Sequence, residues 1–513
     1  MKAKRSILNL VFGLGSQIIT IVLSIFIPRL IMINYGSEAN GLVSSVVQII
    51  AYLALLEAGV GSASLQALYK PIAQNDRSGI NSILSATAMY YRKTGFYYLI
   101  SVIGIAAIYP FAVKSDLAVW QVMAIVLFNG LGGAINYYYQ GKFRVYLLAE
   151  GKSYVDTSVV TLGNIINSLV RIILLLQSVD IVLVQASFFA VTLLQMVAFH
   201  IYKKRHYDWL DFGQKPNLEA INQKNFVLVH ELSYMIFRNT DVIVLTFFTN
   251  LKIVSVYVMY NMVFTIIDNI VNTVNTSFRF VLGQSYHEGK SRFIKLYDAY
   301  ELYFMAFVFS LLTVTYILIL PFITLYTTGV NDVNYVLYWL PILFVVQKLL
   351  INARSSANNV INIAGHFKNT LGRSLTESGI NLGASLILVQ FMGLYGVLLG
   401  TVAALLYRSA DIILYANRRL LERSPWKTFR RWLTNIAVFA GIVYLYHFVD
   451  YQFNSYLSII LGAVVLGVII LPIYLAVSSI LEREVFLYGF GLFKGIGLKV
   501  RAKFVPSKVK VSG

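Results

Sequence analysis

Two basic residues lie deep inside long apolar stretches of the chain, where a charge needs a partner. Arg171 and Lys348 have no acidic residue three or four positions away, so no neighbour on their own helix can neutralise them. Inserting such a charge into a bilayer costs about 2.5 to 3.5 kcal/mol, so it faces protein, water or a ligand rather than lipid. The countercharge must come from another helix or from an anionic ligand. We interpret both residues as candidate contacts for an anionic substrate, because arginine can bind phosphate through two hydrogen bonds and lysine acts as a point charge.

Two further arginines have an acidic residue three positions along, a spacing that brings both side chains onto one helical face. They form the pairs Arg238 with Asp241 and Arg408 with Asp411. For Arg408 we expect a structural ion pair. For Arg238, pairing and substrate contact stay open as equal alternatives.

Three arginines, Arg29, Arg279 and Arg354, lie near the ends of apolar stretches. From there a long basic side chain can reach the membrane surface while its stem stays in the apolar layer. Anchoring at the interface and contact with a ligand are therefore equal alternatives for these residues.

Two carboxylates, Glu57 and Asp268, lie in corresponding apolar stretches of the two halves of the chain, at depths about one helical turn apart. Each either binds a coupling proton or Na+, or neutralises a buried cation. We expect Glu57 to be a countercharge and Asp268 to couple transport to an ion gradient. The sequence contains no nucleotide-binding G-x-x-x-x-G-K-[ST] motif, and apart from a coupling ion we expect no cofactor.

Other chemistry finds little support. The chain has no cysteine, which excludes disulfides, thiol nucleophiles and cysteine-bound metal clusters. The segment His230-Glu-Leu-Ser-Tyr234 begins like a zinc-protease motif but lacks the second histidine. We expect a protein that is not an enzyme and has no metal site of this kind.

The charged residues discussed above lie within apolar runs that are long enough to cross a bilayer. A helix needs about 20 residues for this. We count fourteen runs, with 58% hydrophobic and only 13% charged residues in the chain as a whole. The runs are 6–33, 40–68, 94–113, 118–141, 157–178, 181–202, 226–248, 254–283, 300–327, 335–356, 376–393, 394–416, 432–449 and 455–480.

Basic residues are distributed unequally among the gaps that separate these runs. Of the 42 Lys and Arg residues, 33 lie in the N-terminus, the even-numbered gaps and the tail, and seven lie inside the runs. Only Lys114 and Lys252 lie in odd-numbered gaps. Because cytoplasmic loops carry such an excess, both termini are predicted to be cytoplasmic. The net charge of +19 is spread over short gaps, which indicates contact with membrane lipids and not with nucleic acid.

An internal repeat relates the two halves of the chain. Gly151 and Asn167 recur as Gly365 and Asn381, and the basic pair at 204–205 recurs at 418–419, all with an offset of 214 residues. Each half has six runs, so both enter from the same side and the repeats are parallel. Such repeats usually frame a transport site, although a duplication kept for packing alone is the alternative.

We therefore predict an all-α polytopic membrane protein with about fourteen transmembrane helices, arranged as two parallel six-helix repeats plus two C-terminal helices around a central cavity. The predicted domains are an N-terminal six-helix lobe (1–205), a cytoplasmic linker (206–225), a C-terminal six-helix lobe (226–420), helices 13 and 14 (421–482) and a basic cytoplasmic tail (483–513).

Several segments carry a resemblance to a known family. They are the stretch from Leu8 through Tyr69, with Tyr35-Gly-Ser-Glu-Ala-Asn-Gly41 and Glu57-Ala-Gly-Val-Gly61, and Asn239-Thr-Asp-Val-Ile-Val244 with Val256-Tyr257. Together with the buried cations and the basic inner face, they resemble the polysaccharide flippases (O-antigen or capsule repeat-unit, Wzx-type) of the multidrug/oligosaccharidyl-lipid/polysaccharide exporter superfamily.

The resemblance implies a flippase in the bacterial plasma membrane. It would move an undecaprenyl-diphosphate-linked oligosaccharide from the inner to the outer leaflet by alternating access, with other polysaccharide-assembly proteins as partners. In the related lipid II flippases, arginines on the first and eighth helices line the cavity, which implies that role for Arg29 and Arg279. A cation-coupled multidrug antiporter of the same superfamily is the first alternative, but it would need an acidic cavity. A non-transporting scaffold of a polysaccharide-assembly complex is the second.

Overall fold

The computed structural model describes residues 2–57, 59–221, 240–449 and 451–491, and these residues form helices and no strand. Over the part described, nine helices are long and apolar enough to cross a membrane. Each of the fourteen predicted runs is mainly helical over its described residues. The predicted fold class, an all-α polytopic membrane protein, is confirmed.

The surface of these helices suits lipid rather than water. Side chains such as Phe391, Phe111 and Ile480 are 80%, 79% and 77% exposed, and helix α16 (Tyr456–Leu481) is apolar almost throughout. A water-soluble protein rarely exposes contiguous apolar surface on this scale. With a rise of 1.5 Å per residue, helices of this length cover the roughly 30 Å of a hydrocarbon core.

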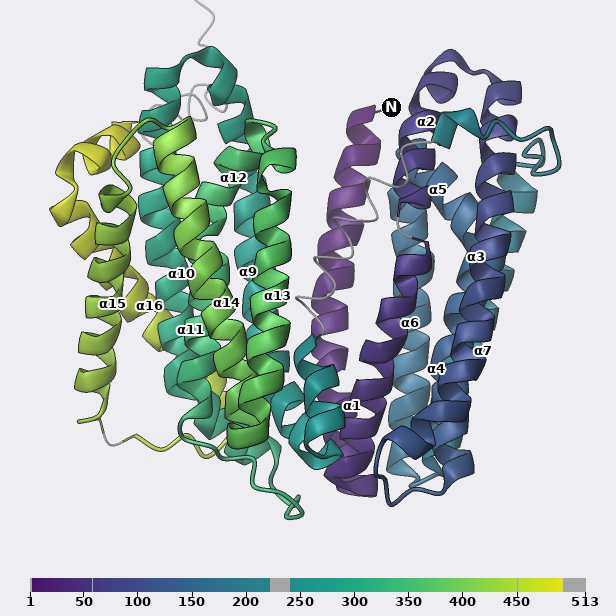
Figure 1. The fold of residues 1–513 in the computed structure, drawn as a ribbon, viewed down its shortest axis with the longest axis horizontal. Coiled ribbons are helices and arrows are strands. Elements are labelled where there is room, and N and C mark those ends of the chain that lie inside the picture. Colours follow the sequence, from purple (N-terminus) through teal and green to yellow (C-terminus); the bar gives the residue numbers. More distant parts are fainter. Residues whose placement is uncertain (1, 58, 222–239, 450, 492–513) are drawn as a thin grey trace, which may run out of the picture. The chain divides into compact units, whose positions relative to one another are not determined.

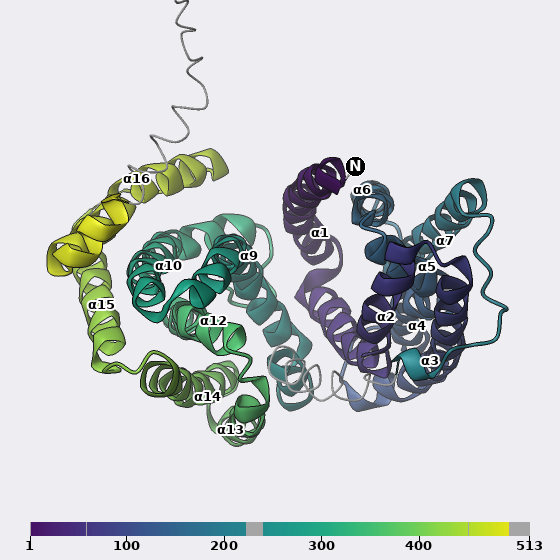
Figure 2. The ribbon, with the colours of Figure 1, turned by 90° about the horizontal axis from the view of Figure 1, so that it is seen from above.

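The chain divides into two compact units, which we describe separately. Unit 1 comprises Met1–Met262, Tyr326–Tyr335 and Leu382–Gly400. Within it, α4 packs against α3 and α7, and α6 packs against α1 and α7 (Figures 1 and 2). Its main helices are α1 (Lys2–Tyr52), α2 (Val60–Gln74), α3 (Arg77–Ala112), α4 (Val119–Ile135), α5 (Gly141–Ala149), α6 (Ser153–Leu176) and α7 (Ile181–His206). Gly36, with φ of 81°, breaks α1 into two segments.

Unit 2 comprises Val263–Leu325, Val336–Asn381 and Thr401–Gly513. The last two helices pack on α10, through an edge-to-face contact of Phe309 with Trp432 and a 2.8 Å hydrogen bond between the hydroxyls of Thr313 and Tyr474. The helices that contribute to it are α9 (Leu251–Glu288), α10 (Lys290–Tyr326), α11 (Leu340–Ala353), α12 (Ser355–Ile363), α13 (Phe367–Met392), α14 (Leu394–Tyr415), α15 (Trp426–Tyr446) and α16.

Helix boundaries repeat at the offset found in the sequence. Both ends of α5 and α12 are 214 residues apart, and so are the starts of α6 and α13. The turn before α6 is made by Gly151 and the turn before α13 by Gly365, with φ of 74° and 73°. Only glycine enters that left-handed region without a steric cost, so the same residue recurs at the same turn. The internal repeat is confirmed, whereas the predicted lobe boundaries stay a prediction.

Candidate functional site

The buried Lys348 and the partly buried Asp268 form an ion pair in unit 2. Lys348 lies on α11 and Asp268 on α9, with 2.8 Å between Nζ and Oδ2, and Asn352 donates to the other carboxylate oxygen at 2.7 Å. One turn earlier on the same two helices, the rings of Phe264 and Phe344 stack with centroids 5.3 Å apart. This apolar contact fixes the spacing of the helices at the level of the pair. The countercharge of Lys348 is thus supplied by another helix.

The polar contacts continue along the same helices. Two turns beyond Asp268, the Asn275 side-chain oxygen accepts hydrogen bonds from Asn359 of α12 at 2.7 Å and from the Tyr300 hydroxyl of α10 at 2.5 Å. A run of buried polar groups thus follows the contact of α9 with α11 and α12. Polar groups in lipid-facing helices turn toward protein in this way because hydrocarbon cannot satisfy them.

Three arginines and two carboxylates form an arginine cluster in unit 2: Arg354, Arg373, Arg408, Glu377 and Asp411. Glu377 of α13 contacts Arg354 at 2.9 Å and Arg408 at 3.4 Å. Asp411 of α14 contacts Arg408 at 2.8 Å and Arg373 at 2.5 Å. The predicted pairing of Arg408 with Asp411 is confirmed.

The arginine cluster carries more positive than negative charge. Its three guanidinium groups face two carboxylates, and Nη1 of Arg354 is buried with no hydrogen-bond partner among the described residues. Arg373 is the most exposed member, at 39% of its side chain, and its guanidinium lies over the Tyr415 ring at 4.8 Å. Buried hydrogen-bond donors normally have a partner. The unsatisfied Nη1 of Arg354 is therefore available to bind an anionic ligand.

Arg171 is the corresponding feature of unit 1. Its Nε is buried on α6 without a hydrogen-bond partner, and the side-chain oxygen of Asn167, one turn earlier, is also buried and unpartnered among the residues that the structure describes. No ion pair to Arg171 occurs in that part of the chain. The repeat-related Asn381 likewise has an unpartnered buried oxygen.

Two predicted carboxylates of unit 1 are held by tyrosines. Glu57 follows a short 3-10 helix and accepts a 2.6 Å hydrogen bond from the hydroxyl of Tyr91 on α3. Asp241 is buried and accepts a 3.0 Å hydrogen bond from the hydroxyl of Tyr257 on α9. The other candidate of that pair, Arg238, lies outside the described residues.

The two arginines implied by the family resemblance differ in their surroundings. The backbone N–H of Arg29 donates to the Tyr326 hydroxyl at 3.1 Å, and its guanidinium donates to the Tyr326 carbonyl. Arg279 is exposed on α9. Arg29 therefore contacts Tyr326 within unit 1, and Arg279 belongs to unit 2.

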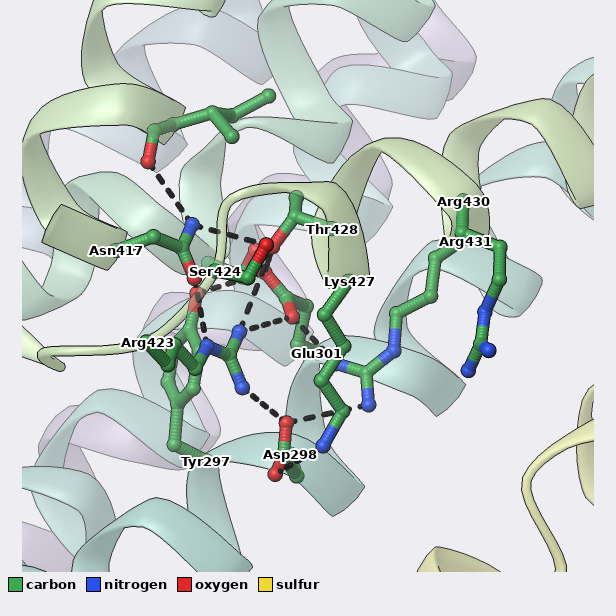
Figure 3. A network of polar contacts seen from close by, with 12 residues as sticks. Tyr297, Asp298, Glu301, Asn417, Arg423, Ser424, Lys427, Thr428, Arg430 and Arg431 are labelled. Carbon is green, nitrogen blue, oxygen red and sulfur yellow. Dashed lines mark hydrogen bonds and ion pairs between the residues drawn. The ribbon is translucent and has the colours of Figure 1, made fainter.

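A second buried charge network, the C-terminal clamp, consists of Asp298, Glu301, Arg423, Arg431 and Glu482. Arg431 of α15, only 1% exposed, contacts Glu482 at 2.5 Å, Asp298 at 3.2 Å and also Glu301. Arg423 contacts Glu301 at 2.8 Å and also Asp298. Figure 3 shows Asp298 and Glu301 of α10 facing basic side chains of the segment before α15 and of its first turns.

Further groups complete the clamp. Lys427 contacts Asp298 at 2.7 Å, and the hydroxyls of Tyr297 and Thr428 donate to Glu301 at 2.8 and 3.0 Å. Burial alone would lower the pKa of Arg423, but the neighbouring carboxylates, Glu301 foremost, raise it above its usual value. Arg423 therefore stays charged, and the clamp joins α10 to the final two helices.

Sequence reasoning missed most of the contacts outside single helices. Arg373 falls in a gap between the predicted runs and Glu377 at the end of one, and each contacts residues of other helices, which spacing along one helix does not predict. The clamp gave no signal in the sequence, because its contacting acidic and basic residues lie between 51 and 133 residues apart. Across the described part of the chain, no group of three His, Asp or Glu side chains could hold a metal ion.

Comparisons with known proteins identify the fold. No family model and no curated protein sequence matches the chain. The structure is similar to the lipid II flippase MurJ in an inward closed conformation, with a TM-score of 0.69 and 13% identity over 93% of this chain and 100% of that one. It is also similar to an inward-facing MATE multidrug resistance transporter of the MOP superfamily, with a TM-score of 0.51 and 15% identity over 78% of this chain and 94% of that one.

A third similar structure is a MOP-superfamily transporter from Pyrococcus furiosus described as having a binding pocket of reverse polarity. Its TM-score is 0.51, with 17% identity over 80% of this chain and 95% of that one. At these identities the likeness concerns the fold alone. The chain has the fold of the MOP-superfamily transporters.

Proposed function

We propose that this protein is a flippase for an undecaprenyl-diphosphate-linked oligosaccharide, which it moves from the inner to the outer leaflet by alternating access. The single observation that carries the proposal is a pair of buried guanidinium nitrogens without hydrogen-bond partners among the described residues. Arg171 and Arg354 each hold a buried guanidinium nitrogen that no described residue satisfies, and the arginine cluster has one more cation than carboxylates.

A diphosphate cannot enter hydrocarbon unaided, because an unpaired ion in a medium of low dielectric constant is very costly. A path that presents unpaired arginines lowers that cost. Arg171 and Lys348 are the primary substrate contacts in this proposal, with Arg354, Arg238, Arg29 and Arg279 as further contacts. The oligosaccharide remains in water throughout.

The likeness to MurJ supports a lipid-linked substrate, since MurJ is a lipid II flippase. The likeness to MATE transporters equally admits a multidrug antiporter. A site for cationic drugs would need an excess of carboxylates, however, and the arginine cluster has the opposite balance. A scaffold that transports nothing would leave these buried, unsatisfied guanidinium nitrogens without a role.

The decisive experiment compares substrates in one preparation. The purified protein is reconstituted into vesicles with a fluorescent polyprenyl-diphosphate oligosaccharide, and in parallel with a cationic dye. We expect movement of the diphosphate lipid to the opposite leaflet and no dye transport. Dye transport alone would establish the antiporter, and transport of neither would favour the scaffold.

For energy coupling we propose an ion site at Asp268 of α9, with a proton or Na+ as the coupling ion. Binding of the ion would compete with Lys348 for the carboxylate at 2.8 Å and so change which groups are free to meet the substrate. Replacing Asp268 by Asn should abolish the dependence of flipping on an ion gradient. The matched Glu57→Gln variant should keep it, because the amide oxygen still accepts the hydrogen bond from Tyr91. An Asp268→Asn protein that still responds to the gradient rules out coupling at this residue.

The proposed orientation places both termini and the 203–225 segment in the cytoplasm of a bacterial cell, on the distribution of basic residues. In this orientation the end of α3 at Ala112 faces the outside and its beginning at Arg77 faces the cytoplasm.

A further inference from the structure

A cavity of about 720 Å³ opens in unit 1 at the end of α3, away from the basic end of that helix. Three separate segments of the chain form its wall: the turn in α1, the loop between α3 and α4, and the start of α9. Its lining consists of Glu38, Pro110, Phe111, Ala112, Val113, Lys114, Ser115, Asp116, Asn250, Leu251 and Lys252.

The two lysines of this cavity are the exceptions to the charge pattern of the whole chain. Lys114 and Lys252 are the only basic residues in the odd-numbered gaps, which are otherwise free of positive charge. The fold brings both of them to the wall of one cavity. Neither forms an ion pair with any residue that the structure describes. Two lysines without ion pairs on the wall of one cavity suit a shared anionic ligand.

The two carboxylates of the cavity, Glu38 and Asp116, form no ion pair with the two lysines in the part of the chain that the structure describes. Glu38 accepts a 2.7 Å hydrogen bond from the hydroxyl of Ser115 and a 2.6 Å hydrogen bond from the backbone N–H of Asp116. It therefore holds the loop after α3 in place. Both hydrogen bonds fall on Oε1 of Glu38, so this residue keeps its charge, and the cavity holds two carboxylates, Glu38 and the exposed Asp116, beside its two lysines.

The cavity wall is fixed by close packing. A Cβ atom on Gly41 would lie 1.8 Å from the Leu251 carbonyl oxygen, so glycine is needed where α1 meets the start of α9. Leu251 and Val113 are buried in one apolar core with residues of α1, α4 and α7. The lysines are thus presented by a preformed wall, which lowers the entropic cost of binding.

Beside the cavity, α3 exposes large apolar side chains. Phe111 is 79% exposed and Ile108, one turn earlier on α3, is 67% exposed. A soluble anion would gain nothing from this surface, whereas a lipid could lay its chains along it while its headgroup reaches the lysines. We propose that this cavity binds the phosphate group of a lipid through Lys114 and Lys252.

Two lipids share this chemistry: an ordinary anionic phospholipid, and a polyprenyl diphosphate at the end of its passage. Only the second source rests on the proposed function. The test titrates the delipidated full-length protein in detergent with phosphatidylglycerol, phosphatidylcholine or a polyprenyl diphosphate, and counts bound lipid by native mass spectrometry. The variant is Lys114→Gln/Lys252→Gln. The control is Lys70→Gln/Lys93→Gln, which removes the same charge from two exposed lysines of α2 and α3.

We expect the wild type to bind an anionic lipid about 30-fold more tightly than Lys114→Gln/Lys252→Gln, from roughly 1 kcal/mol for each basic residue near a lipid surface. The control should bind like the wild type. Tighter binding of phosphatidylglycerol identifies a structural lipid, and tighter binding of the polyprenyl diphosphate identifies an exit site of the transport path. Equal loss in the control, equal affinity for phosphatidylcholine, or full competition by inorganic phosphate would overturn the proposal.

Discussion

The arginine cluster and the C-terminal clamp are built from the same residue types in the same unit, and they differ in how completely the charges are paired. Every guanidinium nitrogen of Arg423 and Arg431 in the clamp meets an oxygen atom. In the arginine cluster, Nη1 of Arg354 meets none among the described residues, and Arg373 is partly exposed beside its single carboxylate.

The difference separates two uses of buried charge. In a fully paired network, the contacts between its own members offset the free-energy cost of desolvation, so each member is needed for stability. None of its donors is available to a ligand. An incompletely paired network is less stable than it could be, and its unsatisfied donors are available to an anion. The clamp is accordingly expected to act as scaffold and the arginine cluster as a binding surface.

The largest effect on stability is expected from the clamp. Replacing Glu301 by Gln removes the charge that Arg423 and Arg431 share, and leaves both arginines with excess positive charge in a fully buried place. We expect a loss of about 3 to 5 kcal/mol in the free energy of unfolding. Thermal unfolding of the detergent-purified protein, followed by tryptophan fluorescence, measures it.

The matched control is Glu422→Gln, which makes the same chemical change in an exposed pair with Lys290 and should cost less than about 1 kcal/mol. Flipping per folded Glu301→Gln molecule should stay near the wild-type rate. A clamp variant that is fully stable but inactive would reverse the distinction drawn between the two networks.

The Lys348 pair should show an intermediate effect. Lys348→Ala leaves Asp268 with only its hydrogen bond from Asn352, and we expect a loss of about 2 kcal/mol in stability together with the loss of flipping. In the double variant Lys348→Ala/Asp268→Ala the stability should largely recover, because no unpaired charge remains, while flipping stays lost. If flipping recovers along with stability, the pair has a structural role only.

Arg354 tests the unpaired part of the arginine cluster. In Arg354→Gln, Glu377 keeps its contact with Arg408, so the cost in stability should stay near 1 kcal/mol. Flipping of the diphosphate lipid should fall at least about 10-fold, the loss expected from one charge-assisted phosphate contact of roughly 1.5 kcal/mol. Normal flipping by this variant would remove the arginine cluster from the substrate path.

The sequence predicted the elements well and their contacts unevenly. The length of an apolar run depends on local sequence, so the helices could be predicted directly from it. The recurrence of Gly151 as Gly365 reflects the duplication, so the repeat could be predicted as well. The pairing of Arg408 with Asp411 could also be read, because a spacing of three residues fixes a shared helical face.

Contacts between distant helices could not be read in the same way. Lys348 meets Asp268 because α9 and α11 pack through Phe264 and Phe344, and nothing in the spacing of the two charges encodes that packing. The same holds for the clamp. Counting charges correctly marked Lys348 as lacking a partner on its own helix, but only the fold tells whether the partner is protein or ligand.

The smallest effect on stability is expected at Arg171, and it gives the sharpest test. Its buried Nε has no hydrogen-bond partner among the described residues, so Arg171→Ala strands no opposite charge and should change the free energy of unfolding by less than about 1 kcal/mol. If the unsatisfied guanidinium exists to meet the diphosphate, this nearly neutral substitution should still abolish flipping. Arg171→Lys should flip only in part, because lysine keeps the charge but loses the bidentate contact with phosphate.

Arg205→Ala, at the exposed end of α7, is the matched control and should flip normally. An Arg171→Ala protein that is stable and flips at the wild-type rate would show that incomplete pairing does not mark a substrate contact in unit 1, whatever the arginine cluster does in unit 2.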